Sequence, residues 1–305
     1  MIATTQGAGR AAGASRARAR AGAPRRGSVL VEFALIAIAF YLLLAGTLEV
    51  GRMITTSQIV QNAARTAARE LALMPLPATM TFEEALACPV VRARIYDPGL
   101  LCVPLPQSTQ AFTDDWPIVN RLLLPVMVAG KVGQEDVLHY PGAIIQRSDD
   151  DDGRSVAVPK VVARGADGVE TVRWVEVLEE VEPSSGGPMA GPFSVASTGP
   201  ERGLVALRIN CAYQASTLTA YQPQPIDTTT PDNRPILAQD GGVSQQNSAP
   251  GSLVGNDAPG AYSGQYGLGK HYALSKEVRP FRRLISGQSI FRREVFSAGT
   301  ACPPH

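Results

Sequence analysis

The sequence predicts an α+β protein. A single transmembrane helix near the N-terminus extends into a long helix, and a mainly antiparallel β body with a disordered loop follows. Three observations lead to this prediction. Residues 33–48 form an uncharged apolar run. Helical spacing of apolar and polar residues continues from there to residue 73. Valine-rich segments bounded by glycines then occupy much of residues 122–181, which is typical of strands.

The basic charge of the chain is concentrated at its N-terminal end. The 305 residues carry a net charge of +1, yet every ionisable side chain before Glu32 is an arginine. These residues are Arg10, Arg16, Arg18, Arg20, Arg25 and Arg26. Residues 28–305 retain 22 basic and 27 acidic side chains, a net charge of −5. We therefore expect a basic leader at residues 1–27 and no nucleic-acid partner for the remainder.

Residues 29–50 are long enough to cross a membrane as one helix. At about 1.5 Å per residue they reach about 33 Å, and a hydrocarbon core is roughly 30 Å thick. Glu49, Gly51 and Arg52 follow at once, so no convincing cleavage site of a secretory signal is present. The arginines place residues 1–27 in the cytoplasm by the positive-inside rule. We expect a single-pass protein of the inner (cytoplasmic) membrane with a periplasmic or extracellular body.

Glu32 is an exception in this apolar segment, because a carboxylate in hydrocarbon costs about 3 kcal/mol unless it is paired or near the interface. One interpretation is an interfacial glutamate that water can reach. The other is a prepilin signature, in which a basic leader ends in glycine and Glu is the fifth mature residue. Counted from Ser28, after Gly27, Glu32 is the fifth residue and Phe33 the sixth. The amino group freed on Ser28 could then pair with Glu32 of a neighbouring subunit.

The helix is predicted to continue beyond the membrane and to span residues 28–73. Apolar residues at helical spacing define one face: Val60, Ala63, Ala67 and Leu71. Polar residues define another: Gln58, Asn62, Arg65 and Arg69. Four small residues can let another helix approach closely: Ala63, Ala64, Ala67 and Ala68. Pro75 ends the pattern, because a proline disfavours helix at the residue before it.

Several of these residues occur in a recognisable order. Gly27 precedes Glu32-Phe33, then comes Glu49-x-Gly51-Arg52, and then an Ala- and Arg-rich stretch, Asn62-Ala63-Ala64-Arg65 and Ala67-Ala68-Arg69. This order resembles TadE-like proteins, minor pseudopilins of the bacterial tight-adherence (Tad, Flp-type) pilus machinery, over about 45 of the 305 residues. The resemblance implies cleavage after Gly27 by a prepilin peptidase. It also implies contacts with other pilus subunits and the inner-membrane assembly platform.

The body is predicted as an extracytoplasmic α+β domain over residues 78–221. A short helix is expected at residues 81–86, with Thr81 as its N-cap. Strands are expected at residues 156–162, 169–177 and 204–213. Residues 222–270 are poor in large apolar side chains, which predicts a flexible low-complexity segment. Residues 271–305 regain apolar and basic residues, and we expect them to dock on the body.

Four cysteines become candidates for disulfides if the body lies outside the cytoplasm: Cys88, Cys102, Cys211 and Cys302. One arrangement pairs Cys88 with Cys102 and Cys211 with Cys302, but sequence alone does not choose among three connectivities. No C-x-x-C pair occurs and the three histidines are scattered, so no metal site is predicted.

Motifs for other chemistry are incomplete. Residues 264–270 match part of a phosphate-binding loop, but His271 stands where Ser or Thr is required. Residues 148–153 resemble the start of a calcium loop, but Pro159 stands where the loop requires glutamate. His139 has no identifiable catalytic partner. We therefore expect neither an enzyme nor a bound cofactor.

The resemblance implies a membrane-anchored minor pseudopilin that assists assembly of an adhesive pilus. The alternative is an uncleaved single-span envelope protein whose outer domain binds a ligand or scaffolds the envelope. The first hypothesis requires Gly27 and Glu32 for function, and the second predicts no dependence on either residue.

Overall fold

The computed structural model describes residues 26–105, 115–132, 135–146, 154–181, 191–196, 201–215, 222–223, 243–245, 252–253, 271–273, 276–278, 282–299 and 302. It divides into two compact units, Met1–Leu44 and Ala45–His305. The fold class predicted from the sequence is confirmed: a long apolar helix is followed by mainly antiparallel sheets.

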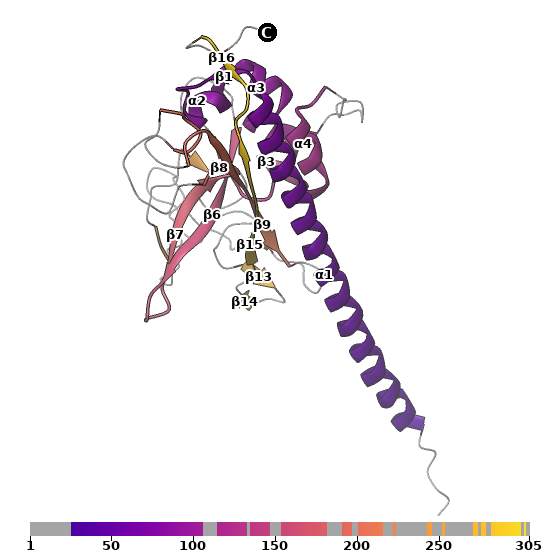
Figure 1. Ribbon diagram of the computed structural model, residues 1–305. Helices are drawn as coiled ribbons and strands as arrows, with labels where there is room; N and C mark the ends of the chain where they lie inside the picture. The colour runs from indigo at the N-terminus through magenta and orange to yellow at the C-terminus, as the bar shows by residue number, and fades with distance from the viewer. Residues whose placement is uncertain are drawn as a thin grey trace, which may run out of the picture. The chain divides into compact units, whose positions relative to one another are not determined.

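The first element is helix α1, Arg26–Leu73, an uninterrupted helix of 48 residues (Figure 1). In the first unit its apolar side chains are exposed, and Phe33, Leu35 and Phe40 are 72%, 64% and 70% accessible. Exposed apolar surface of this extent is expected of a helix surrounded by lipid. Within the described part of the chain, Val29–Leu73 is the one helical segment long and apolar enough to cross a membrane.

In the second unit α1 becomes a core helix. The predicted apolar face is buried, since Val60, Ala63, Ala67 and Leu71 are at most 1% accessible. The predicted polar face is exposed, as its four members show: Gln58, Asn62, Arg65 and Arg69. The sequence pattern therefore identified both faces correctly.

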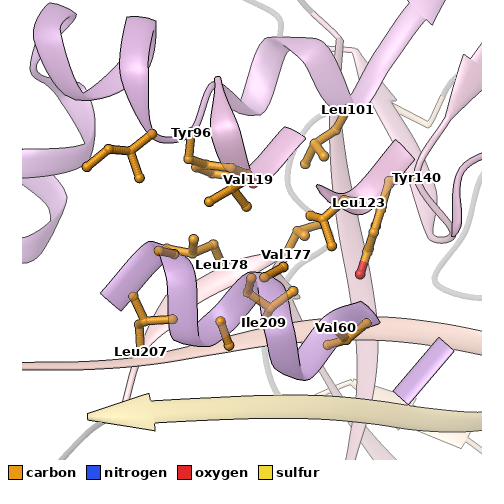
Figure 2. Close-up of a cluster of buried hydrophobic side chains, with 14 of the residues drawn as sticks. Val60, Tyr96, Leu101, Val119, Leu123, Tyr140, Val177, Leu178, Leu207 and Ile209 are labelled. Carbon is orange, nitrogen blue, oxygen red and sulfur yellow. The ribbon is translucent and has the colours of Figure 1, made fainter. Parts of the chain in front are cut away.

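The sheet that borders this core contains three strands in the order β15-β9-β8. Strand β9, Leu204–Gln214, pairs antiparallel with β15, Arg282–Arg292, over eleven residues, and with β8, Leu178–Glu180. Alternate residues of β9 enter the core: Val205, Leu207, Ile209, Cys211 and Tyr213. Figure 2 shows Leu207 and Ile209 in one buried cluster with Val60 of α1, Val177 and Leu178.

A second sheet has the order β11-β7-β6-β5-β12. Its centre is antiparallel and consists of β5, Ala143–Gln146, β6, Arg154–Arg164, and β7, Glu170–Glu176. The predicted strands at residues 156–162, 169–177 and 204–213 thus correspond to β6, β7 and β9. The β6–β7 register shifts between Val161 and Ala163, a bulge that the sequence pattern did not reveal.

Smaller elements complete the body. Strands β2, Cys102–Pro104, β3, Val128–Val132, and β4, Glu135–His139, form an antiparallel sheet. The short helices are α2, Phe82–Ala87, α3, Pro89–Arg94, and α4, Ile118–Leu123, with 3-10 turns at Pro98–Leu101 and Leu124–Val126. The predicted cap of α2 is confirmed as a capping box. The Thr81 hydroxyl accepts from the Glu84 amide at 3.3 Å, and the Thr81 amide donates to the Glu84 carboxylate at 2.8 Å.

Parts of residues 222–270 form strands instead of loop. The described residues there are β10, Gln222–Pro223, β11, Val243–Gln245, and β12, Ser252–Leu253. Strand β11 pairs parallel with β7, and β12 pairs antiparallel with β5. Strand β10 pairs with β13, His271–Ala273, which also pairs with β14, Lys276–Val278. The remainder of residues 222–270 lies outside the described residues.

The C-terminal segment returns to the end of α1. Strand β1, Leu76–Pro77, pairs parallel with β16, Phe296–Ser297. The buried Arg293 guanidinium donates to the carbonyls of Phe193, Leu76 and Pro77 at 3.1, 2.8 and 2.9 Å. It also stacks on the Phe193 and Phe296 rings, with centroids at 4.2 and 4.9 Å. One side chain thereby joins three segments that are distant in the sequence.

This return explains why the arrangement of disulfides considered from the sequence is wrong. The structure pairs Cys88 with Cys302, while Cys102 and Cys211 are free and buried. The β1–β16 pairing brings residues near 300 close to the start of α3, which sequence patterns could not reveal. Burial raises the pKa of the Cys102 thiol and raises that of Cys211 to about 11, so both stay protonated and unreactive near neutral pH.

Helix α1 approaches β15 unusually closely. A Cβ atom added to Gly287 would lie 2.7 Å from the Val60 carbonyl oxygen and 2.8 Å from the Gln61 Cα atom. The Gln61 side chain donates to the Gln288 carbonyl at 2.8 Å and accepts from the Gln288 amide at 3.3 Å. The Gln61 side chain thus forms hydrogen bonds with edge backbone groups of β15 that could otherwise pair with another strand.

We expect Gly287→Val to lower the free energy of unfolding by about 1–3 kcal/mol or more, because the new side chain must displace the backbone of α1. Urea or thermal unfolding in detergent measures this change. Gly51→Ala is the matched control, since its new Cβ would meet nothing within 4 Å. Alanine favours helix, so this control should be neutral or slightly stabilising. Equal stability of Gly287→Val and the wild type would contradict the close contact.

We expect two thiols per chain to react after denaturation without reductant, and four after reduction. The two thiols that react without reductant are those of Cys102 and Cys211, because Cys88 and Cys302 are bonded to each other. Reduction should also lower the free energy of unfolding by about 2–5 kcal/mol, since it releases a crosslink across a long loop. Mass spectrometry after alkylation counts the thiols. Four reactive thiols before reduction would refute this pairing.

Candidate functional site on the N-terminal helix

The predicted processing residues all lie in the first two turns of α1. The helix already includes Gly27 and Ser28 in its first turn. Glu32 and Phe33 follow one turn later, and the side chains of both are exposed in this unit. Ser28 and Glu32 are separated by four residues, so helical geometry puts these two positions on one face of α1.

The first turn is the part of α1 that opens at least cost. The first four amides of a helix have no intrahelical acceptor, so unwinding there breaks few hydrogen bonds. The Gly27–Ser28 peptide bond lies within this turn. A peptidase could therefore reach an extended backbone at this bond without opening the remainder of the helix.

The four predicted helix-packing alanines pack against the body of their own chain. Ala63, Ala64, Ala67 and Ala68 are at most 1% accessible and belong to the main core of the second unit. The expectation that another helix approaches them is therefore corrected, since their small side chains instead let the chain's own body pack closely on α1. Sequence reasoning identified the buried surface but not its partner.

Sequence reasoning missed a polar contact at the end of the apolar run. The Tyr213 hydroxyl donates to the Glu49 carboxylate, and it lies 3.1 Å from the Glu49 backbone oxygen. Arg52 Nη1 lies 3.7 Å from the same carboxylate, one helical turn away. The i,i+3 spacing of Glu49 and Arg52 on a helix would have predicted this ion pair. Tyr213 was not predictable, because it is 164 residues away in the sequence.

This contact changes the acid–base properties of the tyrosine. Burial raises the pKa of Tyr213, and the hydrogen bond to the Glu49 carboxylate raises it further. Burial likewise raises the pKa values of Tyr96 and Tyr140. A tyrosine held protonated in this way stabilises the fold below about pH 10, the pKa of a tyrosine in an unfolded chain.

The residues considered for other chemistry do not assemble into a site. His139 is buried at the end of β4, with Nδ1 2.9 Å from the Tyr140 carbonyl oxygen, and burial lowers its pKa. Within the described ranges, no group of three or more His, Cys, Asp or Glu side chains could hold a metal ion. The motifs at residues 148–153 and 264–270 lie outside the described residues.

Comparison with known proteins supports the N-terminal assignment. The family described as TadE-like protein matches this chain over residues 27–69. No curated protein and no solved structure matches the chain. The match ends within α1, four residues before the helix does. Together with the apolar helix, it indicates a membrane protein associated with the Tad pilus system, a structural rather than an enzymatic family.

We expect Tyr213→Phe to lower the free energy of unfolding by about 1.5–3 kcal/mol below pH 10, because it removes a hydrogen bond to a charged group. The raised pKa of Tyr213 makes its contribution complete below pH 10 and progressively lost at higher pH. The difference between variant and wild type should therefore shrink in alkaline solution. Unfolding experiments between pH 7 and 11 measure it, with the exposed Tyr41→Phe as control. A difference that stays constant with pH would rule out this linkage.

Proposed function

We propose that this chain, TadE-like over residues 27–69, is a minor pseudopilin-like protein that assists assembly of a Tad/Flp-type adhesive pilus. One observation carries the proposal: the matched segment includes the exposed apolar part of α1, which contains a carboxylate one turn after a glycine–serine pair. In this function the helix anchors the protein in the inner membrane, and residues beyond about 50 lie in the periplasm or outside the cell.

Two features favour an extracytoplasmic body. The arginine-rich residues 1–27 have the composition of a segment that stays in the cytoplasm. The body carries the Cys88–Cys302 disulfide, and such bonds persist in oxidising compartments. The two features are independent, since one depends on leader charge and the other on the chemistry of the folded domain.

Processing would change the charge of the helix N-terminus. Hydrolysis of the Gly27–Ser28 bond by a prepilin peptidase removes six arginines and leaves one ammonium group on Ser28. That ammonium group is a suitable counter-ion for Glu32, in the same chain or in a neighbouring subunit. Pairing lowers the cost of keeping the Glu32 carboxylate in hydrocarbon, so removal of the leader favours entry into a bundle of helices.

Contacts with other pilus subunits would use the first part of α1. The alanine-rich part from Val60 to Leu71 is already buried by the body of the same chain. The exposed apolar residues between 29 and 44 remain accessible to helices of other subunits and of the assembly platform. This division assigns anchoring and assembly to the first unit and display of a surface domain to the second.

The test is the N-terminal residue and intact mass of protein purified from membranes with and without the prepilin peptidase. We expect a chain that begins at Ser28 only when the peptidase is present. We also expect Glu32→Ala to remain in the membrane but to reduce piliation strongly, because the ammonium group loses its counter-ion. Glu70→Ala, on the same helix beyond the apolar segment, is the matched control and should leave piliation unchanged.

A chain that keeps residues 1–27 in the presence of the peptidase, together with normal piliation in Glu32→Ala, would reject this function. Those two results would instead support an uncleaved single-span envelope protein with a ligand-binding or scaffolding domain.

A further inference from the structure

A groove of about 520 Å³ lies between α1 and the C-terminal end of β9 in the second unit. One wall is a single face of α1, made by Thr47, Leu48, Gly51, Arg52, Thr55, Thr56 and Ile59. The other wall consists of residues 125–128, Pro141 and residues 211–214. The volume lies within the range of small-molecule binding sites in proteins.

The lining of this groove is amphipathic. Both walls contribute apolar residues, Leu48 and Ile59 from α1 and Val126 and Met127 from the opposite wall. Arg52 is the one formally charged residue among those that line it, and its side chain is 54% accessible. The neighbouring Glu49 carboxylate accepts from the Tyr213 hydroxyl and lies 3.7 Å from Arg52 Nη1, so a phosphate would share Arg52 with it; Glu49 itself does not line the groove. The groove thus combines one cation at its rim with apolar residues on both walls.

The position of the groove along α1 matches the depth of lipid headgroups. The predicted span ends at residue 50, and about 1.5 Å per residue puts Arg52 roughly 3 Å beyond it and Thr55 roughly 8 Å beyond it. The headgroup layer on each side of a bilayer is roughly 5–8 Å thick. With a span that ends at residue 50, Arg52, Thr55 and Thr56 would lie at the level of lipid phosphates, where the Thr55 hydroxyl already donates to the Gly51 carbonyl at 3.0 Å.

Gly51 keeps the helical wall open. A Cβ atom at this position would meet nothing within 4 Å, and the residue has ordinary helical backbone angles. Neither packing within the described residues nor conformation requires glycine here, although glycine weakens a helix. Its effect is to let a ligand approach the backbone of α1 beside Arg52.

We propose that this groove binds the headgroup of an anionic phospholipid of the surrounding bilayer. The phosphodiester lies against Arg52, whose planar guanidinium suits phosphate oxygens. The glycerol and first methylene groups lie along the apolar residues of the walls. The proposal rests on the membrane anchoring in the proposed function, and it does not depend on leader cleavage. A bound lipid would fix the height of the body above the bilayer.

The experiment uses the full chain in nanodiscs of equal parts phosphatidylglycerol and phosphatidylcholine. After extraction into mild detergent, native mass spectrometry counts the lipids that each variant retains. We expect the wild type to retain phosphatidylglycerol preferentially, and Arg52→Gln to reduce this retention about tenfold, as loss of a charged hydrogen bond implies. Arg52→Lys should reduce retention less than Arg52→Gln does, because it keeps the positive charge but loses the planar guanidinium.

Two glycine variants separate occupation of the groove from general effects on the helix. Gly51→Leu fills the groove and should reduce retention as Arg52→Gln does. Gly46→Leu is the control, because Gly46 does not line the groove and an added Cβ there also meets nothing within 4 Å. This variant should retain lipid as the wild type does. Arg65→Gln removes an exposed cation from the same helix away from the groove and should also have no effect. Thermal unfolding verifies that each variant is folded.

Equal retention of both lipids, or unchanged retention in Arg52→Gln and Gly51→Leu, would overturn the proposal. A dimer that Gly51→Leu alone dissociates would also overturn it, and would assign the groove to a second copy of the chain. A chain that never enters the nanodiscs would overturn both this proposal and the membrane anchoring. Failure of leader cleavage alone would overturn only the processing step, because the uncleaved chain contains the same groove.

Discussion

The fold depends on the close contact between α1 and the β9–β15 sheet. Gly287 lets the backbone of β15 approach Val60 of α1. The buried alanines of α1 reduce the distance between the helix and the body further along the helix. Close packing of this kind tolerates little change in side-chain volume, because neighbouring atoms have no free space to occupy. The Gln61–Gln288 hydrogen bonds fix the register of the helix against the strand. A membrane-type helix is thereby built into the core of a β domain.

This constraint divides one helix between two environments. Most side chains of residues 29–44 are large and apolar and all are exposed, whereas the buried face beyond residue 60 is mostly small. Lipid accepts large apolar groups at any orientation, so the first part needs no defined face. The second part must match a fixed sheet, so its residue sizes follow a helical period. The same helix therefore contributes an apolar segment to the first unit and a core helix to the second.

Local features were predictable from the sequence, and long-range contacts were not. Pro75 marked the end of α1, Thr81 and Glu84 marked the start of α2, and valine-rich runs marked β6 and β7. Each signal acts within a few residues, where backbone geometry and side-chain spacing determine the outcome. The Cys88–Cys302 bond, the Arg293 hydrogen bonds and the Tyr213–Glu49 hydrogen bond each join residues more than 90 apart. They depend on how the sheets assemble, which no local pattern encodes.

The two carboxylates at the ends of the apolar segment present the same physical problem with different solutions. Glu49 follows the run, where the body supplies the Tyr213 hydroxyl and the helix supplies Arg52. Glu32 lies near the start of the run, in a unit that is described as a single helix. A carboxylate at that depth is costly unless a cation is close, and basic side chains of a leader disappear with the leader. A new amino terminus at Ser28, one helical turn from Glu32, would place a positive charge near this carboxylate at the moment when the arginines are removed. In the proposed function, processing therefore exchanges a tail that holds the N-terminus in the cytoplasm for a compact ion pair suited to a helix bundle.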